Sequence, residues 1–166
     1  VREVSSRVGI PVAVKFRPSF TAPAHVAVRL VEEGGAAGLV IFNRFYGPDY
    51  DLDTLDLVPK LVLSTSDELR LPMTWAAVLF GRTRADLGLA TGIHTYKDVL
   101  KAMMAGAAVT HMGSELTRNG LGRIREILQN LKGWLEEREY DSLRQLQGSM
   151  SQRHLASPDC LERSAL

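Results

Sequence analysis

The stretch "LGLATGIHTYKDVLKAMMAGAAVTHMGSEL", residues 87–116, decides the fold, because in it two short apolar runs flank a segment with helical spacing. The first run stops at Thr91-Gly92 and the second stops at Gly113-Ser114. A strand, a helix and a second strand in this order predict two parallel strands joined by a right-handed crossover. Parallel strands end at the same edge of a sheet. We therefore expect the two pairs of small residues to lie close together.

The rest of the chain continues this alternation of apolar runs and helical segments. A threonine followed three residues later by an acidic residue marks a helix start twice, at Thr65 with Glu68 and at Thr95 with Asp98. Thr21 is the predicted N-cap of an earlier helix. The predicted strands cover 11–16, 37–42, 85–91 and 107–112, and the predicted helices cover 1–8, 22–33, 67–80, 96–105, 121–138 and 142–147. Apolar strands separated by helices predict an α/β fold with a parallel sheet.

Two segments depart from this order. Residues 44–65 are rich in aspartate and carry alternating leucines, which favours short extended pieces such as a hairpin. Residues 148–166 have weak periodicity, so we divide the chain into a domain over 1–147 and a C-terminal tail. The long helix has one predicted core face, formed by Leu121, Ile124, Leu128, Leu131 and Leu135.

Composition limits the class of protein. Hydrophobic residues make up 45% and charged residues 23% of the 166 residues, which is typical of a globular domain with a sizeable core. The net charge of +1 gives no reason to expect nucleic acid or a membrane surface as a partner. The histidines show no metal-ligand spacing, so no metal site is predicted. Cys160 is the only cysteine, which fits a reducing cytoplasm and excludes an internal disulfide.

Two polar residues stand at the ends of predicted strands. Strand alternation places Lys15 on one face with Ala13, opposite Phe16. The ammonium of Lys15 either meets an anionic or electron-rich ligand or extends into solvent. Asn43 follows the second strand, where its amide either contacts a ligand as donor and acceptor or forms a turn.

Thr91-Gly92 and Gly113-Ser114 form the most specific candidate site. Glycine lets a ligand approach the backbone, and free N–H groups at the start of a helix attract phosphate. Ordinary turns between strands and helices use the same residue types, so turn chemistry is the alternative interpretation.

Three weaker candidates lie elsewhere. Ser64-Thr65 could add hydroxyl groups to a site, although helix capping explains the pair as well. His94 falls in a predicted loop, and His111 falls in a strand that can be fully packed.

Four segments together carry a family resemblance. They are "IPVAVKFRPSF" (10–20), "GLVIFNRF" (38–45), most of the opening stretch and "EREYDSLRQLQGSMSQR" (137–153). These segments resemble the C-terminal half of dihydroorotate dehydrogenases, and more closely the bacterial proteins described as dihydroorotate dehydrogenase-like. The resemblance implies strands 5 to 8 of a (β/α)₈ TIM barrel with FMN at the C-terminal ends of the strands. It also implies a flavoprotein oxidoreductase that converts dihydroorotate to orotate in pyrimidine biosynthesis.

The resemblance gives three residues a role at the flavin ring or the substrate. Lys15 resembles the family's strand-5 lysine, which contacts the N1/O2 edge of the flavin. Phe42 resembles a residue that contacts the flavin through its backbone. Asn43 resembles the asparagine that hydrogen-bonds the pyrimidine substrate.

The resemblance assigns the other candidates to the phosphate side of FMN. Thr91-Gly92 resembles the phosphate loop after strand 7, which is usually richer in glycine. Gly113-Ser114 resembles the pair after strand 8 that receives the phosphate. Ser64 matches a serine near the cofactor, with threonine in place of the glycine that usually follows it.

Some family features are not matched. The family's catalytic base lies on a loop before the residue that matches Lys15, so we expect no catalytic residue here. We expect the missing half-barrel or a second copy of the chain, as a homodimer, to cover the open sheet edges. Residues 44–65 depart from the biosynthetic enzymes, so a dihydroorotate-like small molecule is as far as the substrate is predicted. A phosphate-binding half-barrel without redox activity, and a structural subunit without a ligand, are the other interpretations.

Overall fold

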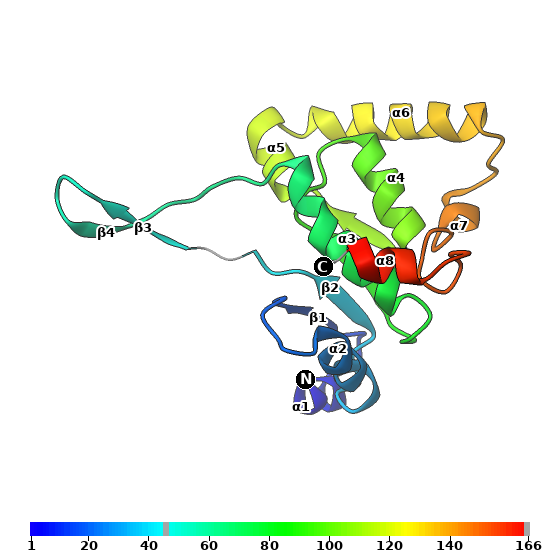
Figure 1. Cartoon of the computed structure of the whole chain (residues 1–166), viewed down its shortest axis with the longest axis horizontal. Coiled ribbons are helices and arrows are strands. Elements are labelled where there is room, and N and C mark those ends of the chain that lie inside the picture. The colour runs from blue at the N-terminus through cyan, green and yellow to red at the C-terminus, as the bar shows by residue number, and fades with distance from the viewer. Residues whose placement is uncertain (45–46, 165–166) are drawn as a thin grey trace.

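The computed structural model describes residues 1–44 and 47–164 and has an α/β architecture (Figure 1). Four parallel strands form one sheet in the order β1-β2-β5-β6, and β3 and β4 form a separate antiparallel pair. The predicted α/β fold with a parallel sheet is therefore confirmed. The elements are α1 (Arg2–Arg7), β1 (Ala13–Phe16), α2 (Pro23–Glu32), β2 (Gly38–Ile41), β3 (Pro48–Asp51), β4 (Asp56–Pro59), the 3₁₀ helix η1 (Ser66–Leu69), α3 (Arg70–Leu79), β5 (Asp86–Ala90), α4 (Tyr96–Ala105), β6 (Val109–His111), α5 (Gly113–Asn119), α6 (Gly122–Glu137), α7 (Leu143–Leu146) and α8 (Asp159–Ser164).

The two faces of the four-stranded sheet differ in chemistry. Phe16, Ile41 and Leu89 occupy one row across the strands, and all three are buried. The neighbouring row points the other way, because side chains alternate along a strand. It contains Lys15, Val40, Gly88 and Val109, of which Lys15 and Val109 are exposed. One face is thus a core face, and the other, which we call the open face, is small and partly polar.

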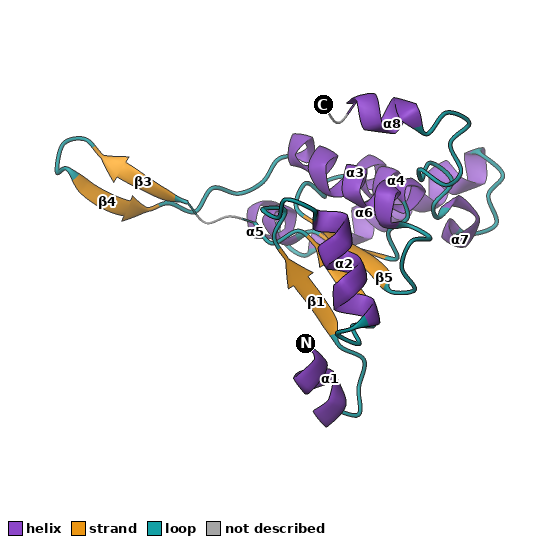
Figure 2. Cartoon of the chain, turned by 60° about the horizontal axis from the view of Figure 1, so that its bottom comes forward, coloured by secondary structure: helices purple, strands orange, loops and turns teal. Residues whose placement is uncertain are grey.

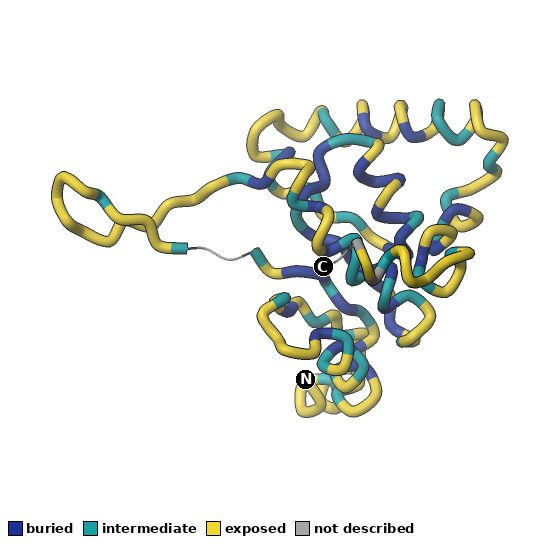
Figure 3. Tube along the Cα trace, viewed as in Figure 1, coloured by how far each residue is buried: buried dark blue, intermediate teal, exposed yellow. Residues whose placement is uncertain are grey.

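The core lies between the buried face of the sheet and three helices. Figure 2 shows α2, α3 and α4 with the sheet, and Figure 3 shows burial concentrated where they meet. Leu39 and Leu87 of the sheet belong to one cluster with Val31 of α2, Leu79 of α3 and Ala102 of α4. A parallel sheet with its helices packed on one face is the arrangement of half a (β/α)₈ barrel, as the family resemblance implied.

Both predicted capping boxes are present. Thr95 and Asp98 exchange the expected bonds at the start of α4, and Thr65 and Glu68 do the same at the start of η1. The predicted N-cap Thr21 is wrong. Ala22 holds the N-cap position of α2 and makes no side-chain capping bond, and Pro23 follows in the first turn, where the N–H that proline lacks would have no partner within the helix.

The predicted core face of the long helix is wrong at three of its five positions and correct at Leu131 and Leu135, which pack in or against the core. Ile127 and Leu131 are buried, whereas Leu121, Ile124 and Leu128 are exposed. Two overlapping apolar stripes run along α6, about one residue apart. Packing against α4 buries Ile127 and Leu131 and leaves Leu121, Ile124 and Leu128 outside.

The segment predicted over 44–65 contains the expected hairpin. Tyr50 pairs with Leu57 across β3 and β4, which stand clear of the body (Figures 1 and 2). Residues 45–46 of that segment lie outside the described residues.

The proposed tail is more structured than its weak periodicity indicates. The Gly148 N–H donates to the Met103 carbonyl, and the Gln152 N–H donates to the Ala77 carbonyl, so this part packs on α3 and α4. Helix α8 follows, and the division at residue 148 stays a prediction. Within 1–44 and 47–164, none of the helices combines the length and the apolar character needed to cross a bilayer.

Candidate functional site

The two pairs of small residues lie at one edge of the sheet. Strands β5 and β6 are hydrogen-bonded in parallel, with Ala90 opposite His111, so their C-terminal ends are neighbours. Thr91 and Gly92 both adopt positive φ angles, 84° and 79°. A Cβ on Gly92 would lie 2.2 Å from the backbone nitrogen of Leu69, so only glycine fits there.

Ser64 joins the two strand ends. Its N–H donates to the Oγ of Ser114 over 3.0 Å, and its own Oγ accepts a long bond of 3.5 Å from the Gly92 N–H. Ser64 is only 2% exposed. The structure thus brings together three of the predicted positions, and whether they bind a ligand stays a prediction.

A buried polar chain that the sequence reasoning missed continues from Ser64. The Oγ of Ser64 lies 3.1 Å from Nε2 of His94, and Nδ1 of His94 lies 3.0 Å from Oε2 of Glu115. The Glu115 carboxylate also accepts bonds from Arg123 at 2.5 Å and from Asn119 at 2.9 Å. The only sequence signal was that His94 and Glu115 each stand shortly after a strand end, as do the predicted residues.

The charge of Glu115 is stabilised by its partners. Burial by itself would raise the pKa of this carboxyl group, but hydrogen bonds from His94, Arg123 and Asn119 outweigh burial and lower the pKa overall. Glu115 is therefore a buried carboxylate whose charge holds the start of α5 against the loop after β5.

Positive charge remains close to the strand ends. Arg118 donates from its two terminal nitrogens to the carbonyl oxygens of Ser64, at 2.9 Å, and Leu63, at 3.1 Å. These acceptors are neutral, so the guanidinium charge is not cancelled by a carboxylate among them. A site that combines small residues with such a charge suits an anion.

The chemistry at the second strand end also fits a phosphate group. The Ser114 hydroxyl accepts the Ser64 N–H, which leaves its own proton free to donate. A Cβ added to Gly113 would meet nothing within 4 Å, so the backbone there can be approached closely. The donors present are those that phosphate oxygens require.

The lysine predicted at the ring end of a cofactor lies on the open face. Lys15 is exposed, and it makes no hydrogen bond or ion pair with any residue in the described part of the chain. Phe16, on the same strand, points into the core. The predicted orientation of Lys15 on its strand is therefore correct, while its ligand stays a prediction.

Phe42 and Asn43 follow β2 at the same edge. The Phe42 ring is buried edge-on against Phe16, with ring centroids 5.3 Å apart, so only the backbone of Phe42 is left to face a ligand. The Asn43 N–H donates to the Phe16 carbonyl over 2.7 Å. Asn43 itself is exposed, so its amide is accessible to a ligand.

His111 also belongs to the open face. It is exposed rather than fully packed, and its Nε2 lies 3.1 Å from where a Cβ of Gly88 would stand. Gly88 thus leaves room for the imidazole ring.

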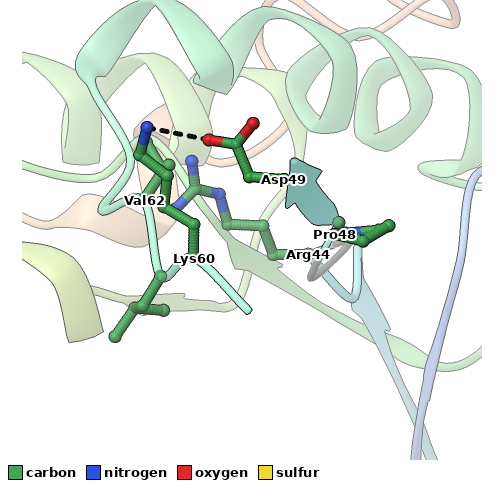
Figure 4. Close-up of a pocket in the computed structure, with 7 residues that line it drawn as sticks. Arg44, Pro48, Asp49, Lys60 and Val62 are labelled. Carbon is green, nitrogen blue, oxygen red and sulfur yellow. Dashed lines mark hydrogen bonds and ion pairs between the residues drawn. The ribbon is translucent and has the colours of Figure 1, made fainter. Parts of the chain in front are cut away.

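A separate hollow of about 380 Å³ lies at the root of the hairpin (Figure 4). Lys60 there pairs with Asp49 at 2.9 Å, and Arg44 pairs with Glu68 at 3.1 Å. Because both cations already have carboxylate partners, this hollow is a weaker anion site than the strand ends.

Comparison with known proteins gives a consistent picture, although no family model matches the chain. The catalytic subunit of dihydroorotate dehydrogenase B (NAD(+)) from Caldicellulosiruptor saccharolyticus is 25% identical over 154 residues, which cover 91% of this chain and 50% of that protein. Dihydroorotate dehydrogenase A (fumarate) from Limosilactobacillus reuteri is 31% identical over 114 residues, 67% of this chain and 37% of that protein.

The fold shows the same likeness. The crystal structure of ligand-free type DHODH from Eimeria tenella superposes with a TM-score of 0.65 at 18% identity, covering 82% of this chain and 38% of that one. The chain spans 50% and 37% of the length of the two curated relatives named above.

Proposed function

We propose that this chain, which is similar in sequence and fold to dihydroorotate dehydrogenases over most of its length, supplies the FMN-binding half of an oxidoreductase of that type. The observation that carries the proposal is the convergence of Gly92, Ser64 and Ser114 at one sheet edge. The ammonium of Lys15, which has no partner among residues 1–44 and 47–164, stands on the open face of the same sheet.

The phosphate end of the cofactor would be held at the ends of β5 and β6. Ser114 would donate its hydroxyl proton to a phosphate oxygen while its oxygen continues to accept the Ser64 N–H. Gly113 would let the phosphate approach the backbone, and Arg118 would add positive potential.

The ring end would lie over the open face. When bound, FMN would accept the hydride of a dihydroorotate-like substrate. Lys15 would hold a positive charge beside the electron-rich edge of the ring, and Asn43 would orient the substrate through its amide. Phe42 would present only its backbone. The reaction also needs a base, and none of these residues is placed to act as one.

The open face would need a cover. Strands β1 and β6 are the edge strands of the sheet, and exposed edges pair readily with other chains. We propose that a complementary half-barrel, or a second copy of this chain, closes the site and excludes water from it. The single cysteine supports the cytoplasm as the proposed location.

Titration with FMN and with riboflavin, followed by flavin fluorescence, tests the proposal. We expect Ser114→Ala to weaken FMN binding about tenfold and to leave riboflavin binding unchanged, because one charge-assisted hydrogen bond to phosphate is lost. Lys15→Ala should weaken both ligands. Failure of the unmodified chain to bind FMN at millimolar concentration would contradict the proposal.

A redox-inactive phosphate-binding module is the second candidate. Apart from Ser64, the phosphate-side features lie on the segments that follow β5 and β6, whereas Lys15 lies on β1, at the opposite edge of the sheet. This separation makes the two functions distinguishable. If FMN and a simple sugar phosphate bind equally well, and Lys15→Ala changes neither, the module without a flavin is correct.

A further inference from the structure

Three buried polar side chains form a row at the ends of β5 and β6. Ser64, His94 and Glu115 are 2%, 7% and 4% exposed, and the two contacts that join them in this order span 3.1 and 3.0 Å. Buried polar groups need hydrogen-bond partners, and in a row each partner constrains the next one. The direction of these hydrogen bonds therefore determines where the hydroxyl proton of Ser64 points.

The direction is set at Glu115. Its carboxylate already accepts hydrogen bonds from Arg123 at 2.5 Å and from Asn119 at 2.9 Å. An ionised carboxylate only accepts, so the proton between Glu115 and Nδ1 of His94 must be carried by Nδ1. In the neutral ring the other nitrogen, Nε2, is then an acceptor. Ser64 is left as the donor to Nε2.

Ser64 connects the imidazole ring to both strand ends. Because its hydroxyl proton is donated to His94, its oxygen keeps a lone pair for the Gly92 N–H, which lies 3.5 Å away. Its backbone N–H donates to the Ser114 hydroxyl over 3.0 Å. The place of Ser64 between Gly92 and Ser114 thus depends on the acceptor that the ring provides.

The loop after β5 has a strained backbone that needs such support. Thr91 has a φ angle of 84°, a conformation that β-branched residues rarely adopt. A strained conformation persists only where the surrounding contacts hold it. The Gly92 N–H is bonded to Ser64, and the backbone N–H of His94 donates to the Asp98 carboxylate over 3.1 Å. His94 therefore holds the loop through its backbone and, by way of Ser64, through its ring.

We propose that His94 is a positioning residue of the phosphate site. Its ring does not touch the ligand, because it is buried and both of its nitrogens already have partners within the chain. It acts through Ser64, by keeping Gly92 and Ser114 in place to receive an anion. This inference rests on the proposed function, in which the anion is the phosphate group of FMN.

Flavin titration separates this role from a general effect on the fold. His94→Leu removes the acceptor for the Ser64 hydroxyl, so we expect FMN binding to weaken about tenfold and riboflavin binding to stay unchanged. His94→Gln should bind FMN within about threefold of the unmodified chain, because its amide oxygen can replace Nε2 as the acceptor. A merely structural role would weaken both ligands and would not distinguish the two variants.

His154→Leu is the matched control. Nδ1 of His154 lies 3.1 Å from the Oγ of the buried Ser151, so this substitution removes the same kind of pair. The pair lies at the other end of the strands, because His154 packs against Phe80, which precedes β5. FMN and riboflavin should bind this variant as they bind the unmodified chain. Circular dichroism checks that each variant is folded.

Nuclear magnetic resonance tests the hydrogen-bond order without a ligand. In the unmodified chain at pH 8, the nitrogen-15 signals of the His94 ring should show a proton on Nδ1 and none on Nε2. The amide signals of Ser64 and Gly92 should move in His94→Leu and stay in place in His154→Leu.

Several outcomes would overturn this inference. They are a proton on Nε2 of His94, unmoved amide signals of Gly92 in His94→Leu, equal losses of FMN affinity in His94→Leu and His94→Gln, and unchanged FMN affinity in His94→Leu. Failure of the unmodified chain to bind FMN would instead contradict the proposed function. The resonance measurements would then still decide whether His94 holds the strand ends.

Discussion

The strand ends around Ser64 and the hairpin arm, residues 47–63, are adjacent in the chain but are stabilised in different ways. Around Ser64, polar groups are buried and bonded to residues 28 to 54 positions away. In the arm, side chains are exposed and paired only across the hairpin. The comparison shows that one short connection can link a region stabilised by the whole fold to a region stabilised by its own turn. Substitutions in the two regions should therefore differ greatly in their effect on stability.

The largest expected effect is at Gly92. Gly92→Ala forces a side chain onto a positive-φ residue and against the Leu69 backbone, so the free energy of unfolding should fall by about 3 kcal/mol. Urea denaturation measures it. Gly133→Ala is the control, because this helical glycine has open space around it and the change should raise stability by roughly 0.5–1 kcal/mol. A loss of similar size at both positions would contradict the close packing at the strand end.

Glu115→Gln should have the next largest effect. The neutral amide cannot replace the charge that His94, Arg123 and Asn119 surround, so we expect a loss of about 2 kcal/mol in the free energy of unfolding. Glu136→Gln, on an exposed part of α6, is the control and should leave stability nearly unchanged. Equal stability of the Glu115→Gln chain and the unmodified chain would show that the buried network is not stabilising.

The pH dependence of stability tests whether the charge of Glu115 stabilises the fold. The pKa of Glu115 is lowered in the folded state, so its contribution is present above its ordinary value of 4.5 and is lost as the pH falls through the lowered value. The stability difference between the unmodified chain and Glu115→Gln should be constant near neutral pH and shrink in acid. A stability difference that grows as the pH falls would contradict the lowered pKa of Glu115.

The smallest effect is expected in the arm. Leu57→Ser should change the free energy of unfolding by less than about 0.5 kcal/mol, because its side chain is mostly exposed and packs against little of the body. Measurement at low protein concentration avoids any contribution from association. A loss comparable to that of Gly92→Ala would mean that the arm is part of the folding unit, and the contrast between the two regions would fail.

Local patterns in the sequence predicted the strands, both capping boxes and the hairpin, because each of these depends on residues close together in the chain. The neighbouring positions of Gly92 and Ser114 were also predictable, since parallel strands joined by one helix must end side by side. The buried chain through His94 and Glu115 was not, because its partners are 21 and 30 residues apart and meet only after the strands pair. The exposed face of α6 was mispredicted because both of its stripes are apolar, and only tertiary packing selects between them.

The two bonds from Arg118 have a mechanical consequence. Arg118 belongs to the same short helix as Ser114. It donates hydrogen bonds to the carbonyl oxygens of Leu63 and Ser64, at the end of the segment that returns from the hairpin. The peptide of Ser64 is thus clamped on both sides, by its N–H to Ser114 and by its oxygen to Arg118. A force applied at the hairpin tip would therefore reach the body at two attachments, the Arg44–Glu68 pair before the hairpin and the Ser64 peptide after it, which adjoins the loop that contains Gly92.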